Sequence, residues 1–258
     1  MTNKYSKEIR STVTSEGNLE LSITKVQVPT PNDDEVLIEV HAAPISPSDL
    51  ALLITFGADL ANINISGSGE NTVASMKVHP AMMKSMKSRM DQPMPVGNEG
   101  AGVIVDAGSN VKHLIGKTVG LAGGAMYSQY ICVPAVNCLV MDDETTPAEA
   151  ASSFVNPMTA LSFIETMKME NHSAIVNTAA ASNLGQMLVK ICNDGDIPLV
   201  NIVRTQEQVD LLKNIGAKYV CNTSDENFKE TLVAALIETG ATLGFDATGG
   251  GNNGELPG

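Results

Sequence analysis

The second half of the chain alternates short apolar runs with amphipathic segments. Apolar runs of strand length fall at 173–178, 198–203, 218–222 and 242–246. Segments with helical spacing lie at 183–194, 206–215 and 226–239. A regular alternation of strand and helix is typical of a parallel sheet whose strands are joined by right-handed crossovers. The pattern therefore predicts an α/β fold for this half. A further helical region is expected at 146–167, beginning with Thr146 and Pro147.

The first half shows strand periodicity instead. Mixtures of apolar and β-branched residues predict strands at 19–28, 35–42, 116–121 and 127–133, and residues 95–108 form a glycine-punctuated turn that leads into another strand. Turn-forming residues separate these runs. Residues 1–140 are therefore expected to form an antiparallel, barrel-like β domain with many turns.

Three segments of the first half have other patterns. Ser48 or Asp49 can N-cap a short helix at 50–54. Residues 58–72 are small, polar and glycine-rich, which predicts a loop. Methionines recur at mostly helical spacing across 73–90, with Lys or Arg between them. We interpret this stripe as a packing face, the alternative being a lid or a wall of a substrate pocket.

Composition narrows the class of protein. Hydrophobic residues make up 43% of the 258-residue chain, but aromatic residues only 3%, so the core is expected to consist of aliphatic residues and methionine. The net charge of −13 argues against nucleic acid and anionic membranes as partners. No signal peptide and no membrane-spanning run is visible. Four cysteines without disulfide or metal spacing predict reduced thiols and a cytoplasmic protein: Cys132, Cys138, Cys192 and Cys221.

In the second half, the residues that indicate a binding function lie at 173–204. This stretch reads as a strand, a turn of small residues, a helix, and a second strand that ends in a cation. Small side chains let the backbone approach a diphosphate, which the N–H groups at the start of the helix can then bind. Ala180, Ser182 and Gly185 occupy the three positions of the G-x-G-x-x-G/A pattern. Arg204 stands where a residue meets the adenosine ribose, and a cation there suits the 2′-phosphate of NADP(H). The alternative is a plain βαβ unit that binds nothing.

Five segments, in order, resemble the medium-chain dehydrogenase/reductase superfamily, in its zinc-independent quinone-oxidoreductase and enoyl-reductase branch. They are residues 45–50, 96–108, 155–161, 177–186 and 201–204. The resemblance implies an α/β protein with a GroES-like β-barrel domain at 1–150 for substrate and catalysis. It also implies a Rossmann-type, doubly wound parallel sheet at 151–258 that binds NADP(H). Relatives continue past this sheet with two more strands, so either the sheet here is part of a longer one or the chain closes differently.

The resemblance also bears on metal. Zinc-dependent relatives have a Cys where Ser46 stands and a His where Asn98 stands. A hydroxyl and an amide are poor substitutes for these ligands. The four closely spaced cysteines of a structural zinc lobe are missing as well. The resemblance therefore implies a zinc-free protein.

Roles for individual residues follow from the resemblance. The backbone N–H groups around the helix start would hold the diphosphate, a second group would hold the 2′-phosphate, and two residues would lie near the nicotinamide. The diphosphate group consists of Ala181, Ser182, Asn183, Leu184 and Gly185. The 2′-phosphate group consists of Arg204, Thr205 and Gln206, and the two residues near the nicotinamide are Asn156 and Thr159. Ser46 and Asp49 would face the catalytic cleft, the alternative for Asp49 being a helix cap alone.

The roles of several other polar residues of the first half can each be interpreted in two ways. Glu99 can be a structural hydrogen-bonding carboxylate or a catalytic one. Tyr127 and Tyr130 are expected to be packing residues with solvated hydroxyls, the alternative being proton donors. Enoyl-thioester reductases of the branch use a Tyr close to the position of Phe56, and a phenyl ring cannot donate a proton.

Three classes of function remain open. The first is an NADPH-dependent quinone or enone reductase, in which solvent can protonate the product. The second is an enoyl-thioester reductase, and the third is a nucleotide-binding or structural protein that keeps the fold without catalysis. The expected partner is a small-molecule substrate. A homodimer is possible if the full-length chain carries the usual sheet edge.

Overall fold

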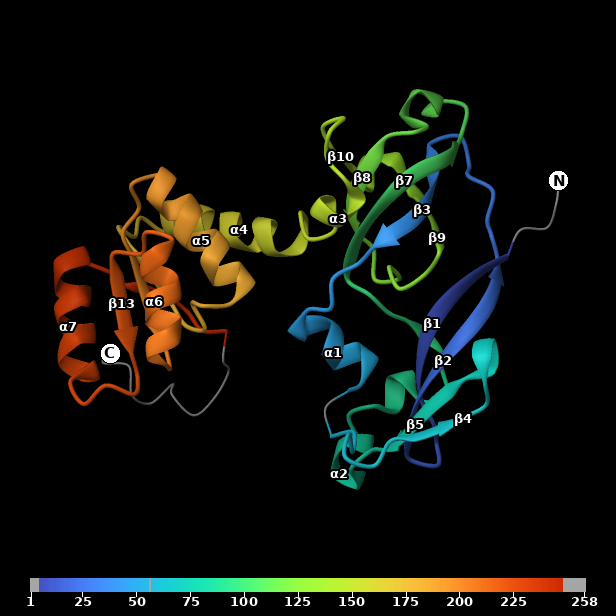
Figure 1. The fold of residues 1–258 in the computed structure, drawn as a ribbon, viewed down its shortest axis with the longest axis horizontal. Coiled ribbons are helices and arrows are strands. Elements are labelled where there is room, and N and C mark those ends of the chain that lie inside the picture. Colours follow the sequence, from blue (N-terminus) through green and yellow to red (C-terminus); the bar gives the residue numbers. More distant parts are fainter. Residues whose placement is uncertain (1–4, 56, 248–258) are drawn as a thin grey trace. The chain divides into compact units, whose positions relative to one another are not determined.

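The computed structural model describes residues 5–55 and 57–247, and its contacts divide the chain into two compact units, Met1–Val155 and Asn156–Gly258 (Figure 1). Each unit is described by itself below. Phe56, which was considered above, lies outside the described residues.

The first unit contains two antiparallel sheets of five strands. One has the order β4-β5-β2-β1-β6 and the other β10-β8-β7-β3-β9. The first consists of β1 (Tyr5–Val13), β2 (Asn18–Gln27), β4 (Asn64–Ser66), β5 (Val73–Lys77) and β6 (Met94–Pro95). The second consists of β3 (Glu35–Ala42), β7 (Glu99–Ala107), β8 (Thr118–Ala122), β9 (Tyr130–Pro134) and β10 (Leu139–Val140). The second sheet surrounds a core of aliphatic side chains that includes Ile38, Ile104 and Leu121.

Strand β1 joins the two sheets. The N–H of Ile9 donates to the carbonyl of Tyr127 at 2.9 Å, and the N–H of Gln129 donates to the carbonyl of Lys7 at 2.9 Å. These bonds attach the start of β1 to the segment that leads into β9. The two sheets therefore form the continuous, barrel-like domain that the strand pattern predicts.

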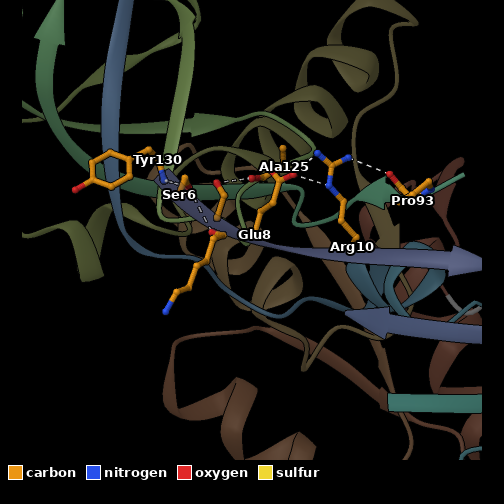
Figure 2. A network of polar contacts seen from close by, with 8 residues as sticks. Ser6, Glu8, Arg10, Pro93, Ala125 and Tyr130 are labelled. Atoms are coloured by element: carbon orange, nitrogen blue, oxygen red, sulfur yellow. Dashed lines mark hydrogen bonds and ion pairs between the residues drawn. The ribbon is translucent and has the colours of Figure 1, made fainter. Parts of the chain in front are cut away.

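Side chains strengthen this junction (Figure 2). The backbone N–H of Tyr130 donates to the hydroxyl of Ser6 at 3.2 Å. Further along β1, the guanidinium of Arg10 pairs with the carboxylate of Glu8 and donates to the carbonyl of Pro93 at 3.0 Å. Arg10 thereby ties β1 to the segment that enters β6.

The segment from 73 to 90 differs from its helical pattern. It contains strand β5, helix α2 (Pro80–Met83) and a 3₁₀ turn at Lys87–Arg89. Residues 73–77 pair with residues 18–22 of β2, and this non-local pairing overrides the local spacing of the methionines. Pro80 also restricts the residue before it to an extended backbone. The expected loop at 58–72 likewise contains the short strand β4 and a 3₁₀ turn at Gly69–Asn71.

The methionines of this segment do form a packing face. Met76 is buried, and Met82, Met83 and Met86 pack beside it. Their cluster also contains the buried side chains Val13 and Leu19 of β1 and β2.

Two helices lead from the first unit into the second. The expected helical region divides into α3 (Pro147–Ala150) and α4 (Val155–Met169). As expected, Thr146 is the N-cap of α3, and its hydroxyl accepts a hydrogen bond from the N–H of Glu149.

The second unit is a four-stranded parallel sheet with the order β13-β12-β11-β14. Its elements are β11 (Ile175–Asn177), α5 (Asn183–Asp194), β12 (Leu199–Val203), α6 (Gln206–Asn214), β13 (Tyr219–Asn222), α7 (Phe228–Thr239) and β14 (Leu243–Phe245). The strand order runs outward from β11 to β13 and then returns to the other side of β11. One face of the sheet packs against α5 and α6, and the other packs against α7. The expected α/β fold with a barrel-like domain and a doubly wound parallel sheet is confirmed.

Candidate functional site

The turn after β11 is made of small residues in a constrained backbone. Ala179 has a φ of +49°, a left-handed conformation that costs a residue with a Cβ about 1 kcal/mol or more. Ala180 is buried in the core beneath the turn. A Cβ on Gly185 would lie 2.1 Å from the carbonyl oxygen of Ala180. Helix α5 therefore packs so tightly against the turn that only glycine fits at position 185.

The start of α5 presents donors. Ser182 is the N-cap, and its hydroxyl accepts a hydrogen bond from the N–H of Gly185 at 3.2 Å. The N–H groups of Asn183 and Leu184 have no acceptor among the described residues. Such first-turn donors, together with the helix dipole, form a site that suits an anion.

A cavity of about 270 Å³ adjoins this turn, where β11, β12 and β13 end. It is lined by Thr178, Ala179, Ala181, Ser182, Ile202, Val203, Arg204, Gln208 and Thr223. The turn of small residues and Arg204, which the sequence assigned to neighbouring phosphates, thus line one cavity. Ligands of open α/β sheets bind at this edge, outside the carboxyl ends of the strands.

Arg204 is held by its backbone and not by its side chain. Its N–H donates to Oε1 of Gln208 at 2.9 Å, and its carbonyl accepts from the hydroxyl of Ser224 at 2.6 Å. The guanidinium is exposed and makes no hydrogen bond or ion pair with another described residue. In a chain of net charge −13, it is a cation at this edge of the sheet that is available to a ligand.

The other expected phosphate-binding residues are occupied locally. The hydroxyl of Thr205 caps α6 by accepting from the N–H of Gln208 at 3.3 Å. The amide of Gln206 donates to Asp210 at 2.8 Å along the surface of α6. Neither residue is among those that line the cavity, and the same holds for Asn183, Leu184 and Gly185.

Three polar residues that line the cavity were not among the predicted cofactor-binding residues. Thr178 and Thr223 directly follow β11 and β13, and Gln208 lies in the first turn of α6. Thr178 donates to Asp246 at 2.7 Å and accepts from the N–H of Ala247 at 2.9 Å, so it is held against the segment after β14. The sequence could have indicated these residues only by their positions, because each stands just after the end of a strand or at the start of a helix.

Glu99 supports the start of α4. It is 2% exposed, and its Oε2 accepts from the N–H groups of Phe154 at 3.2 Å and Val155 at 2.8 Å. A carboxylate at this place satisfies first-turn donors and complements the helix dipole. This geometry favours the structural interpretation of Glu99. Asn156 and Thr159 lie one turn apart on the same helix, and so share one of its faces.

Asp49 is the centre of a polar cluster in the first unit. Helix α1 (Pro47–Leu53) begins earlier than expected, with Ser46 as its N-cap, so the prediction that Ser48 or Asp49 is the cap was wrong. Asp49 is 2% exposed; its Oδ2 accepts from the N–H of Ser46 at 2.8 Å and its Oδ1 from the N–H of Asn98 at 2.7 Å. The amide of Asn98 donates to the hydroxyl of Ser48 at 3.2 Å. Asp49 thus fixes the two segments that resemble family motifs against each other.

The tyrosine hydroxyls bond to protein groups, whereas the sequence analysis expected them to be solvated. Tyr127 donates to the carbonyl of Pro44 at 2.9 Å. Burial, followed by the proximity of Asp49, raises the pKa of Tyr127 to about 12. Tyr130 donates to Oε1 of Glu39 at 2.5 Å.

Residues 5–55 and 57–247 contain no cluster of three or more His, Cys, Asp or Glu side chains able to hold a metal ion. None of the helices in these ranges is long and apolar enough to cross a bilayer.

The chain is similar to known reductases. Residues 32–143 match the alcohol dehydrogenase GroES-like domain. A mitochondrial enoyl-[acyl-carrier-protein] reductase of Xenopus tropicalis is 28% identical over 211 residues, which are 78% of this chain and 51% of the relative. The chain thus spans about half the length of the curated relatives it matches.

Solved structures of quinone reductases are also similar to this chain. A proposed NADPH:quinone reductase from Mesorhizobium loti superposes with a TM-score of 0.70 at 27% identity, covering 97% of this chain and 70% of that one. One from Bacillus thuringiensis has a TM-score of 0.72 at 21% identity, covering 96% and 67%, and shows the shared fold. Together with the motifs in both units, these similarities support the medium-chain dehydrogenase/reductase superfamily, in its branch of quinone and enoyl reductases, as the family that this chain resembles.

Proposed function

We propose that the chain is an NADP(H)-dependent oxidoreductase that transfers a hydride between this cofactor and a quinone or α,β-unsaturated carbonyl compound. The observation that carries the proposal is the cavity at the carboxyl edge of the parallel sheet. There the small-residue turn at Ala181 and Ser182 and the guanidinium of Arg204 line one space.

The cavity, together with the start of α5 that adjoins it, fits a dinucleotide with an extra phosphate. The N–H groups of Asn183 and Leu184 would bind the diphosphate, because they are the unused donors at the start of α5. Arg204 would bind the 2′-phosphate, for which a guanidinium is a geometrically suited partner. Gln208 and Thr223 line the same cavity and would complete the polar wall around the ribose. We assign Asn156 and Thr159 to the nicotinamide end.

The bound nicotinamide supplies the hydride, and the chain's own groups supply orientation. Both carboxylate oxygens of Asp49 already accept backbone N–H groups, so Asp49 acts as a positioning residue for Ser46 and Asn98. We propose that Ser46 faces the substrate. The hydroxyl of Tyr127 already donates to the carbonyl of Pro44, and its raised pKa makes it a weaker acid, so we assign protonation of the product to solvent.

We further propose that the reaction does not require zinc. Ser46 and Asn98 stand where zinc-dependent relatives have Cys and His, and these two residues offer only oxygen or amide groups. The amide of Asn98 is already used in its bond to Ser48.

Steady-state oxidation of NADPH tests the proposal. We expect turnover with members of a quinone and enone panel, faster with NADPH than with NADH, and unchanged after treatment with a chelator. Binding of NADPH by calorimetry without turnover of any acceptor would instead support a non-catalytic nucleotide-binding protein.

A second candidate is an enoyl-thioester reductase. It is favoured by the similarity to enoyl-[acyl-carrier-protein] reductases over 78% of the chain. Crotonyl-thioester belongs in the same assay for this reason. Turnover of the thioester alone, with no quinone reduced, would replace the first candidate by the second.

A further inference from the structure

A groove of about 460 Å³ lies in the first unit, and its lining shares no residue with the cluster around Asp49. Its walls are the turn between β1 and β2 and the segment from the end of β5 to Met90. It is lined by Ser15, Glu16, Gly17, Lys77, Val78, Pro80, Met83, Lys84, Lys87 and Met90. We call it the lysine–methionine groove.

Backbone bonds fix the two walls against each other. The N–H of Val78 donates to the carbonyl of Gly17 at 3.0 Å, and the N–H of Asp91 donates to the carbonyl of Val13 at 2.8 Å. The N–H of Ser15 donates to a carboxylate oxygen of Asp91 at 2.8 Å. The groove is therefore a built feature of the fold and not a gap between mobile loops.

The charge around the groove opposes that of the chain. The chain carries 29 acidic and 16 basic residues, yet residues 73–90 contain four basic residues and no Asp or Glu. Three of the four, Lys77, Lys84 and Lys87, are exposed and line the groove. None of these three forms an ion pair with a described residue. Glu16 is the one carboxylate among the described lining residues.

The fourth basic residue is used inside the fold. The guanidinium of Arg89 donates to the hydroxyl of Ser11 at 3.0 Å and to the carbonyl of Leu52 at 3.3 Å. Arg89 is therefore not among the residues that line the groove, and the basic residues that do are the three exposed lysines. Its charge lies at the rim.

The base of the groove is apolar. Val78 is 5% exposed, and Met83 packs with it in the same hydrophobic cluster. Met90 and Pro80 extend this surface. Methionine side chains are flexible and polarisable, so such a surface adapts to the shape of an apolar partner.

We propose that the lysine–methionine groove docks an acidic amphipathic helix of a partner protein. The apolar side of such a helix would cover Met83 and Met90, while its carboxylates would meet Lys77, Lys84 and Lys87. A small anion would satisfy the lysines but leave the apolar base exposed, so a helix fits the observations better. The proposal does not depend on the nicotinamide site.

The test uses the full chain and a fluorescent synthetic peptide of about 18 residues, long enough for several helical turns, with leucines on one helical face and glutamates on the other. We expect the anisotropy to rise on binding, and the affinity to fall as salt increases from about 50 to 500 mM. The double variant K84E/K87E should weaken binding roughly tenfold or more, since each reversal replaces an attraction with a repulsion. The matched control K213E/K229E changes two exposed lysines of the second unit and should bind as the unaltered chain does.

Several results would overturn the proposal. They are absence of peptide binding, equal loss in both double variants, and equal binding of a peptide with lysines in place of glutamates. Full competition by inorganic phosphate would indicate a small-anion site instead. A dimer of the chain that dissociates in K84E/K87E, measured by sedimentation, would make a second copy the occupant. The lysines are exposed, so thermal unfolding should confirm that both variants fold.

Discussion

Asp49 and Asn98 are 49 residues apart in the chain, yet a hydrogen bond of 2.7 Å joins the carboxylate of the first to the backbone N–H of the second. The same carboxylate holds the start of α1 through the N–H of Ser46. One buried side chain therefore fixes both segments of the first unit that resemble family motifs.

Asp49→Asn should destabilise the protein by about 1–3 kcal/mol, because one of two buried backbone donors would face an NH₂ group in place of an acceptor. The free energy of unfolding in urea measures this. The control is Asp142→Asn at an exposed position, which should change it by less than about 0.5 kcal/mol. Equal stability of the two variants would contradict the structural role of Asp49.

Arg204→Glu should weaken NADPH binding roughly 10- to 150-fold, the equivalent of about 1.5–3 kcal/mol for a lost charge-assisted phosphate contact. NADH lacks the 2′-phosphate, so its affinity should change far less. Calorimetry with both cofactors measures the difference, and Lys213→Glu on the exposed side of α6 serves as the control. The same loss for both cofactors would refute the role of Arg204.

Gly185→Ala should destabilise the second unit by several kcal/mol, because the new Cβ would meet the carbonyl of Ala180 at 2.1 Å and backbone atoms cannot yield. Gly195→Ala, at the other end of α5, should be tolerated, since its Cβ would lie 3.4 Å from its nearest neighbour. Thermal unfolding of the two variants compares identical chemical changes. A stable Gly185→Ala would mean that the turn and the helix are not so closely packed.

Stability should decline at high pH through Tyr127. Its pKa rises from 10.0 to about 12 on folding, so the folded protein holds the phenolic proton more tightly than the unfolded chain does. This stabilisation is fully present below pH 10 and is lost as the pH rises toward 12. In Tyr127→Phe the decline in melting temperature between these two pH values should be shallower, although the lost bond to Pro44 lowers stability at neutral pH.

The comparison of Tyr127→Phe with the unaltered chain must account for other groups that lose protons at high pH. The thiols of the partly buried Cys132 and Cys138 and of the buried Cys192, with pKa values raised from 9.0 to about 11, contribute with the same sign at slightly lower pH. Tyr5→Phe removes the hydroxyl of a half-exposed tyrosine and serves as the control. If both variants decline alike, Tyr127 does not carry the effect.

The cysteines should react slowly and unequally with a thiol reagent at pH 8. Burial raises the pKa of all four thiols, which lowers the thiolate fraction. Cys192 and Cys221 are each 1% exposed and should react only when the second unit opens, after Cys132 and Cys138. Mass spectrometry of alkylated peptides over time resolves the order, and all four should react together in guanidinium. Fast labelling of Cys221 in the native protein would show that its sheet opens readily.

Local pattern was enough to predict the elements of the second unit. Helix α5 was expected at 183–194 and spans Asn183–Asp194, because its polar cap, its apolar stripe and its terminal glycine all agree. The helical spacing of the methionines at 73–90 does not correspond to one helix, because residues 73–77 pair with β2, about 55 residues earlier in the chain.

The residues of the candidate site were likewise predicted only in part. The turn and Arg204 follow a sequence pattern with a known spacing, and they line one cavity. Thr205 and Gln206 were expected to hold the 2′-phosphate together with Arg204, but Thr205 caps α6 and Gln206 bonds to Asp210 along its surface. Thr223 lines the cavity because β13 lies beside β12, and the local sequence does not determine the order of strands in a sheet.

The left-handed backbone of Ala179 has a consequence for ligand binding. A turn of glycines samples many shapes and must be ordered when its ligand arrives. Alanine and serine residues at 179–182 restrict that sampling, so the conformational entropy of this turn is lost when the chain folds. Any anion that reaches α5 therefore meets a receptor already rigid in its receiving shape, and less of its binding free energy is spent on ordering the protein.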